Sequence, residues 1–430
     1  MTGASAGRRI PALATPLGRR QLLGLVAGGI VSAAAGCSLF DRDDPPSFDG
    51  EGQIIFAAPR DISLGGQRRL AVQKWNRDHP TQQAVSVDLP PAADNQRADL
   101  IARLQAWRDD YDVLGLDVVW TAEFARGGYI LPLDSVADQL GLDRFLPSAL
   151  DTARFEGKLW GVPLFSNAGL LYYNTDLVDS APNSWAELAE KAKAASKDGV
   201  AGYVGQLARY EGLTVNLVEA VWGHGGDLLK PDNQTLDVEA TTRSLSFLQG
   251  GIRDGWIPES ARTYDEELSR LAFQGGGAAF MRNWPYAYDL LAAADSPVKE
   301  RFGVVRLPGV SALGGANLAI SQFSRRRRTA LEFIRFLTTD DVQRTVFEKG
   351  GYPAAITSVY ENRSVEGHQP YTQALKEGIR TARSRPVTPF YGQVTRVIQD
   401  AAFSVLVLGE EPARAAQRLS GTLAAALAGR

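Results

Sequence analysis

The 430-residue sequence has little of the side-chain chemistry that builds metal sites or covalent cross-links: one cysteine, three histidines and two methionines. A single cysteine, Cys37, forms no disulfide within the chain and supplies no cysteine-ligated metal site. His79, His224 and His368 lie far apart and lack the spacing of a zinc site or a metalloprotease helix. We therefore expect no metal and no cofactor, and a fold stabilised by packing.

Other absences exclude further classes of protein. Past residue 31 no apolar run reaches the about 20 residues that cross a bilayer. The 46 Lys and Arg residues are nearly balanced by 49 Asp and Glu residues, so no broad basic field is available to bind a nucleic acid. The sequence also lacks a Gly-x-Ser-x-Gly nucleophile elbow and a phosphate-binding loop. Catalysis is thus poorly supported, although 49 acidic residues leave a glycosidase-like carboxylate pair open.

The one cysteine ends an apolar stretch near the start of the chain. Residues 21–37 follow a basic lead and finish in small residues before Cys37. This pattern predicts a removable signal peptide over residues 1–37 and a lipid on Cys37 that anchors the protein outside the cell membrane. The pair Arg19 and Arg20 leaves twin-arginine export open beside the general route.

The remaining roughly 390 residues exceed what one core usually serves, so two domains are expected. Residues 38–52 are polar and rich in helix breakers, which predicts a flexible spacer. Strands alternate with helices from 53 to 120, which indicates an α/β domain with a largely parallel sheet. We predict an N-terminal lobe from 53–172 and 306–351, and a C-terminal lobe from 173–305 and 352–430.

Local signals mark several elements. Ser184 followed by Glu187 is a capping box that predicts a helix to Ser196. Two strand-like runs around 167–169 predict a crossing between the lobes. The run Arg325–Arg328 lies between a predicted strand and a predicted helix, where a solvated stretch of charge is a better explanation than a phosphate or membrane site.

Several predicted loops and strand ends carry the residue types that bind sugars. Aromatic rings stack on the apolar face of a pyranose, and planar carboxylate, amide and guanidinium groups bind its hydroxyls. The candidates are Asp117 and Trp120 at the carboxyl end of a central strand, Asn167 in the crossing, Trp284 and Tyr286 beside Pro285, and Arg385. For Trp284 core packing is the alternative, and for Arg385 an ordinary surface arginine.

Six stretches together resemble one family: 116–125, 167–174, 210–213, 279–286, 313–315 and 385–391. In this order they are similar to the solute-binding proteins of ABC sugar importers, above all the trehalose and trehalose/maltose branch with its trehalose-recycling lipoproteins. The resemblance implies a periplasmic-binding-protein-like fold of two α/β lobes with several hinge crossings (type II) and a ligand cleft between them. It implies a monomer that binds a disaccharide, trehalose as the first expectation, and delivers it to a membrane permease by hinge closure.

The resemblance also implies which residues bind the sugar: Asp61, Gln96, Asp117, Asn167, Glu266, Trp284, Tyr286, Gly315 and Arg385. Gln96 stands where a related protein has a basic side chain, and Ala316 where some relatives have an aromatic one, so the identity of the disaccharide stays open. A secreted glycoside hydrolase and an anchored sugar sensor are the alternatives.

Overall fold

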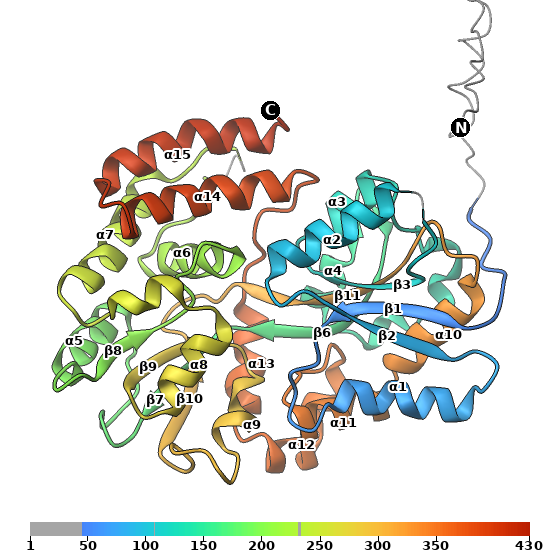
Figure 1. Cartoon of the computed structure of the whole chain (residues 1–430), viewed down its shortest axis with the longest axis horizontal. Coiled ribbons are helices and arrows are strands. Elements are labelled where there is room, and N and C mark those ends of the chain that lie inside the picture. The colour runs from blue at the N-terminus through green and yellow to red at the C-terminus, as the bar shows by residue number, and fades with distance from the viewer. Residues whose placement is uncertain (1–44, 107, 231–233) are drawn as a thin grey trace, which may run out of the picture. The chain divides into compact units, whose positions relative to one another are not determined.

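The computed structural model describes residues 45–106, 108–230 and 234–430. Within this part of the chain, residues 46–430 form one unit that contains two main β-sheets (Figure 1). The predicted signal peptide and its lipid attachment residue Cys37 lie outside the described residues. The two sheets and the segments that join them determine where a ligand could bind.

The first sheet has five strands in the order β2-β1-β3-β11-β6. Their bounds are β1 Ile54–Pro59, β2 Ala84–Leu89, β3 Val113–Asp117, β6 Val162–Ala168 and β11 Leu313–Ile320. β1 pairs in parallel with β2 and β3, whereas β11 is antiparallel to β3 and β6. The predicted parallel sheet is therefore interrupted by one strand, β11, which enters from the other half of the unit.

The second sheet has four strands in the order β10-β7-β9-β8. Their bounds are β7 Leu170–Asn174, β8 Ala201–Val204, β9 Ala278–Asn283 and β10 Phe302–Arg306. Only β8 and β9 pair in parallel in this sheet. A short hairpin of β4 (Arg154–Phe155) and β5 (Lys158–Leu159) stands apart from both sheets.

Helices flank each sheet in Figure 1. Around the first sheet these are α1 Gln67–Asp78, α2 Ala93–Gln105, α3 Thr121–Arg126, α4 Pro147–Thr152, α10 Arg327–Leu337 and α11 Asp340–Gly350. Around the second are α5 Trp185–Ala195, α6 Glu211–Gly223, α7 Val238–Arg253, α8 Glu266–Gln274, α9 Ala287–Leu291, α12 Arg363–His368, α13 Thr372–Thr381, α14 Tyr391–Leu406 and α15 Pro412–Leu427. Among the described helices, none is long and apolar enough to span a membrane.

The chain passes between the sheets at short segments. Gly169 is the only residue between β6 of the first sheet and β7 of the second, and 307–312 leads from β10 back to β11. A third crossing, 351–362, leads from α11 of the first lobe to α12 of the second. Each sheet has an apolar core of its own, and a third core at the crossings is shared by the two lobes, since it packs β6, β11 and α11 against β7, β9 and α13. The predicted lobe limits at 172 and 305 fall within β7 and β10, and the exact limits stay a prediction.

Local sequence signals account for helix starts in the second lobe. Glu187 N donates to Ser184 Oγ at 3.1 Å, which confirms Ser184 as the cap of α5. The Glu187 carboxylate accepts from Asn183 N at 2.8 Å and not from Ser184 N, so the reciprocal half of the predicted capping box is shifted by one residue. Asp265 caps α8 in the same way, because its Oδ1 accepts from Leu268 N at 2.8 Å.

One aromatic candidate is core rather than site. Trp120 is 2% exposed and packs with Phe124 and Leu116 under the first sheet, so it is not available to stack on a sugar. This corrects the expectation that both Asp117 and Trp120 would face a ligand.

The end of the predicted spacer is bound to the first lobe. Arg327 N donates to Asp49 O at 3.2 Å and Arg328 N to Gly50 O at 3.1 Å, at the start of α10. The side chain of Arg328 also pairs with Asp49 at 3.2 Å. Residues 46–52 therefore form part of the fold, contrary to the prediction of a free spacer up to residue 52.

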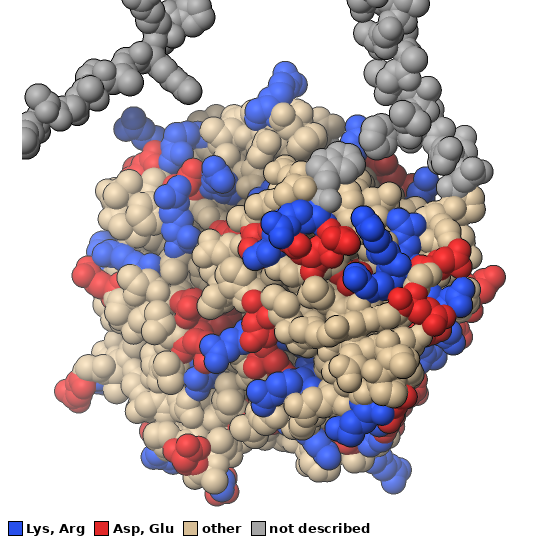
Figure 2. All heavy atoms as spheres, turned by 45° about the vertical axis from the view of Figure 1, so that its right-hand side comes forward, with Lys and Arg blue, Asp and Glu red and all other residues tan. Residues whose placement is uncertain are grey.

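The arginine run is largely paired with acidic side chains. Its ion pairs are Arg325 with Asp109, Arg326 with Asp112, and Arg328 with Asp49 and Glu51. On the face that Figure 2 shows, Lys and Arg side chains likewise lie among Asp and Glu. The run is thus a set of local ion pairs, in agreement with the interpretation as a stretch of surface charge.

A partly buried carboxyl, Asp289 of α9, predicts a pH dependence of stability. Burial raises the pKa of Asp289 from 3.8 to about 6, although Gln369 Nε2, at 3.0 Å from both carboxylate oxygens, and His368 oppose the shift. Because the folded state holds this proton more tightly than the unfolded state, the contribution of Asp289 to stability is present below about pH 4 and is lost as the pH rises through about 6.

We expect Asp289→Asn to remove this loss. Gln369 Oε1 is buried without a partner and could accept from the new amide. The free energy of unfolding of Asp289→Asn, relative to the natural protein, should rise by on the order of 3 kcal/mol between pH 4 and pH 7. Urea unfolding at both pH values measures this, and a difference that does not change with pH would contradict it.

Candidate functional site

A cavity of about 460 Å³ lies between the two sheets and is lined by residues from both lobes. Eight of the nine predicted contact residues line it: Gln96, Asp117, Asn167, Glu266, Trp284, Tyr286, Gly315 and Arg385. The structure thus brings together residues that are far apart in the sequence: Gln96 and Arg385 are separated by 289 positions. The role of each residue toward a ligand stays a prediction.

The ninth residue, Asp61, uses its carboxylate within its own loop. Its Oδ1 accepts from Ser63 Oγ at 2.6 Å, and its Oδ2 accepts from Arg69 N at 3.0 Å at the start of α1. The neighbours Arg60 and Ile62 line the cavity instead. Asp61 is therefore a turn and capping residue in this structure, which does not support the predicted contact.

The first lobe contributes polar groups from adjacent strands. Asp117 ends β3, Gly315 lies in β11 and Asn167 lies in β6. A Cβ at Gly315 would come within 2.4 Å of Phe165 O, and its φ of 133° disfavours any other residue. Because β11 and β6 approach so closely here, their polar backbone and the Asn167 amide lie at the cavity wall.

The second lobe contributes an aromatic wall braced by carboxylates. Trp284 Nε1 donates to Glu266 Oε1 at 3.4 Å, and Tyr210 OH donates to Glu266 Oε2 at 2.6 Å. Tyr286 OH donates to Glu267 Oε1 at 2.7 Å. Burial raises the pKa of Glu266, while the donation from Tyr210 opposes the shift. The orientation of both rings is therefore set by hydrogen bonds from α8 and its neighbours.

Arg385 connects the two lobes at the cavity. It is 2% exposed, and its Nη2 lies 3.1 Å from Asp117 Oδ1 of β3. Its Nη1 donates to Oε1 of Glu211, at the start of α6. The same Oε1 also accepts a hydrogen bond from Tyr391 OH at 2.6 Å. Burial works against the charge, but Asp117 and Glu211 outweigh it and raise the pKa of Arg385. The interpretation of Arg385 as a surface arginine is therefore wrong.

Two lining residues carry buried polar atoms without partners. Asn167 Oδ1, an acceptor, and Arg385 Nε, a donor, make no hydrogen bond. An unpaired buried polar atom costs about 1–3 kcal/mol, so such atoms favour a ligand that supplies the missing partner. A hydroxyl group both donates and accepts, and could satisfy either atom.

Sequence reasoning gave no role to Glu211, Tyr210 or Tyr352, although all three line the cavity. Glu211 and Tyr210 fall within one of the stretches that carried the family resemblance, and an acidic residue at the start of an apolar helix is itself a signal. Tyr352 gave no such signal, since it follows α11 and reaches the cavity through tertiary packing.

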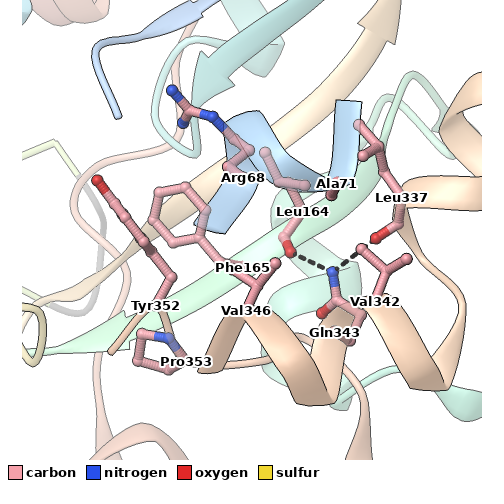
Figure 3. A pocket seen from close by; sticks show the side chains of 10 residues that line it. All are labelled: Arg68, Ala71, Leu164, Phe165, Leu337, Val342, Gln343, Val346, Tyr352 and Pro353. Atoms are coloured by element: carbon pink, nitrogen blue, oxygen red, sulfur yellow. Dashed lines mark hydrogen bonds between the residues drawn. The ribbon is translucent and has the colours of Figure 1, made fainter. Parts of the chain in front are cut away.

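A second, much smaller cavity lies behind the wall formed by Phe165 and Tyr352 (Figure 3). Its volume is about 20 Å³ and it is lined mainly by apolar side chains. Gln343 Nε2 fills its polar side by donating to Leu164 O at 2.8 Å and Leu337 O at 3.1 Å. A space of this size holds at most about one water, so the larger cavity is the candidate site.

The described residues offer no familiar catalytic arrangement at the cavity. None of the three histidines lines it: His79 stacks on Trp75 at 3.6 Å, and His224 and His368 bond backbone carbonyls of their own helices. In the same part of the chain, no group of three His, Cys, Asp or Glu side chains could hold a metal ion. The cavity is lined by aromatic rings, planar polar side chains and backbone groups, which are suited to binding a ligand.

Residues 65–344 match the bacterial extracellular solute-binding proteins. The chain belongs to this family. A probable ABC transporter-binding protein of Deinococcus radiodurans is 31% identical to this solute-binding protein. The match covers 79% of this chain and 85% of the Deinococcus protein. The family and this relative are binding proteins, which confirms the prediction of a non-enzyme and of an extracytoplasmic place of action.

Solved structures confirm the predicted two-lobe, periplasmic-binding-protein-like α/β fold. T. maritima MalE3, solved with maltose, superposes with a TM-score of 0.82 at 31% identity, over 86% of this solute-binding protein and 98% of MalE3. The GacH receptor of Streptomyces glaucescens, solved unliganded and with acarbose, gives a TM-score of 0.78 at 24% identity, over 88% and 99% of the two chains. The latter likeness shows the fold alone.

The buried pairing of Arg385 predicts a large effect of its removal on stability. Arg385→Ala would leave Glu211 and part of Asp117 buried without a counter-ion, which should lower the free energy of unfolding by about 3–5 kcal/mol. The matched control is Arg383→Ala, which removes the exposed pair with Asp227 and should cost less than about 1 kcal/mol. Urea unfolding measures both, and equal small losses would show that the pairing is unimportant.

Proposed function

We propose that this solute-binding protein is the sugar receptor of an ABC importer, and that it binds a disaccharide, trehalose first among the candidates, in the cavity between its lobes. The observation that carries the proposal is that Trp284 and a set of planar polar side chains, Asp117, Asn167 and Arg385, line one cavity. The bound sugar would pass to the transmembrane permease of the importer, and the receptor would act as a monomer.

The chemistry of the lining residues supports a sugar ligand. An indole ring packs on the apolar face of a pyranose, while carboxylates, amides and guanidinium groups bind hydroxyls in pairs. The volume of about 460 Å³ lies within the range of about 300–1,000 Å³ that is usual for small-molecule sites. The maltose bound to the 31% identical MalE3 supports the same class of ligand.

Hinge closure is the proposed means of delivery. The crossings at Gly169 and at 307–312 are short, and each sheet has a core of its own beside the core that the lobes share at the crossings, which supports movement of the lobes about these segments. A sugar that contacts Asp117 in one lobe and Trp284 in the other binds the closed state more tightly and shifts the population toward it.

A ligand screen tests this function. Isothermal titration calorimetry with trehalose, maltose, sucrose and glucose should give the tightest binding for a disaccharide, with trehalose expected to lead. Prolonged incubation with the same sugars should release no glucose. Binding of none of them, or hydrolysis of a disaccharide, would contradict the proposal.

The aromatic wall predicts a specific loss of affinity. Trp284→Ala removes the stacking surface and should weaken binding of the best sugar by at least tenfold, which is about 1.4 kcal/mol. Trp160→Ala is the control, since Trp160 is of similar exposure and does not line the cavity. Both variants are titrated at a temperature where circular dichroism shows them folded. An equal effect of the two would place the stacking wall elsewhere.

The lipid anchor on Cys37 is a separate proposal. Cys37→Ser should release the protein from the membrane fraction and leave its sugar affinity unchanged, because the residue precedes the folded unit that begins at 46. Fractionation of cells followed by immunoblotting measures the release. Retention of the serine variant on the membrane would contradict lipidation at this site.

A further inference from the structure

We propose that the buried ion pair of Glu219 and Arg282 is a positioning element that holds the Trp284 ring and connects it to two of the lobe crossings, Gly169 and 307–312. The inference rests on the proposed function, because it treats Trp284 as part of a ligand site. It assigns roles to two residues that do not line the cavity.

The pair itself is fully enclosed in the second lobe. Arg282 Nε and Nη2 each donate to one oxygen of Glu219, both at 2.8 Å, and each side chain is 1% exposed. Arg282 Nη1 also donates to Gln206 Oε1 at 3.2 Å. With two parallel bonds and a third donor engaged, the guanidinium plane has one allowed orientation.

This plane supports the tryptophan. The guanidinium carbon of Arg282 lies 3.9 Å from the centre of the Trp284 ring, in a cation–π contact. Trp284 lines the cavity and Arg282 does not, so the ring lies between the ion pair and the ligand space. The close approach of the Trp284 ring edge to Gly314 of β11, at 2.9 Å from an added Cβ, limits the ring on another side.

The same pair reaches two crossings. Glu219 Oε1 accepts from Ala312 N at 3.0 Å and from Ser311 Oγ at 3.1 Å, in the segment that leads into β11. Ser311 Oγ in turn accepts from Gly169 N at 2.6 Å, at the single residue between β6 and β7. One carboxylate therefore connects the support of the aromatic wall to two of the three places where the chain changes lobe.

Gly169 shows how tightly these groups fit. A Cβ at this position would lie 2.6 Å from Arg282 Nη2 and 2.8 Å from Glu219 Oε1. Such distances are far below contact distance, so the crossing packs against the ion pair only without a side chain. A change in the angle of this crossing must therefore move or strain the pair.

Stability alone is a weak reason for this arrangement. Burying two charges costs free energy that their attraction often only offsets, and apolar replacements of similar volume are frequently as stable. A geometric role accounts for charges in this position, because an apolar pair would neither fix the plane beneath Trp284 nor bond the backbone at Ala312.

A double-mutant cycle in sugar affinity tests the link to the ligand. Arg282→Lys keeps the charge but loses the planar, bidentate fork. We expect it to weaken trehalose or maltose binding at least tenfold in the natural protein, and by less than about twofold in a Trp284→Ala background. Equal losses in both backgrounds would mean that Arg282 acts independently of the ring and would overturn the proposal.

A second measurement reports the environment of the Trp284 ring in the absence of any ligand. In protein labelled with 5-fluorotryptophan, the ¹⁹F resonance of Trp284 is assigned by Trp284→Phe. Arg282→Lys and the milder Ser311→Ala, which breaks the bonds to Glu219 and Gly169 at the crossing, should both shift or broaden this resonance. The control Gln249→Ala removes hydrogen bonds at the far end of α7, to Val405 O and Glu410 O, and should not.

The two experiments separate the two proposals. If no sugar binds but Ser311→Ala and Arg282→Lys move the Trp284 resonance, the proposed function fails and the positioning role stands. If sugar binds and the resonance stays unchanged in both variants, the function stands and the connection from crossing to ring is refuted. Thermal unfolding of each variant confirms that the readout comes from folded protein.

Discussion

The pairing of buried charge is the constraint on which the site and the connection of the lobes depend. Arg385 is nearly inaccessible, and an unpaired guanidinium in such a place would be prohibitively costly. Its two partners come from different lobes, Asp117 from the end of β3 and Glu211 from the start of α6. The ends of a first-lobe strand and a second-lobe helix are therefore held at the same point, and the cavity forms around it.

Much of the fold was predictable where the signal is local. Helix α5, Trp185–Ala195, agrees with the predicted helix from Ser184 to Ser196, because its Ser184 cap is specified by adjacent residues. β11 runs through Gly314 and Gly315, although glycine is disfavoured in the interior of a strand. In the structure Gly315 is a strand residue that the backbone of Phe165 approaches too closely for a side chain.

The composition of the site was predictable in part, and the limit is again tertiary packing. The family resemblance placed eight residues that do line one cavity, but residue type alone could not separate Asp117 from Asp61, or Trp284 from Trp120. Each member of these pairs has the chemistry to bind a sugar. The difference is whether a side chain is already engaged within the fold. The Asp61 carboxylate accepts a hydrogen bond from the start of α1, and the Trp120 ring is packed in the first-lobe core.

Helix α6 shows why the supporting residues were harder to find. It is buried along nearly its whole length, and it carries two glutamates, Glu211 and Glu219, among apolar residues. A buried carboxylate is commonly paired with a cation, but the sequence does not say that the partners are Arg385 and Arg282, 174 and 63 residues away. The two glutamates are about 12 Å apart along the helix axis. Since a helix is rigid, α6 sets the separation between the polar anchor at Arg385 and the support of the Trp284 ring. The proposed closure would therefore change the position of first-lobe groups such as Asn167 relative to that frame, while the frame itself keeps its dimensions.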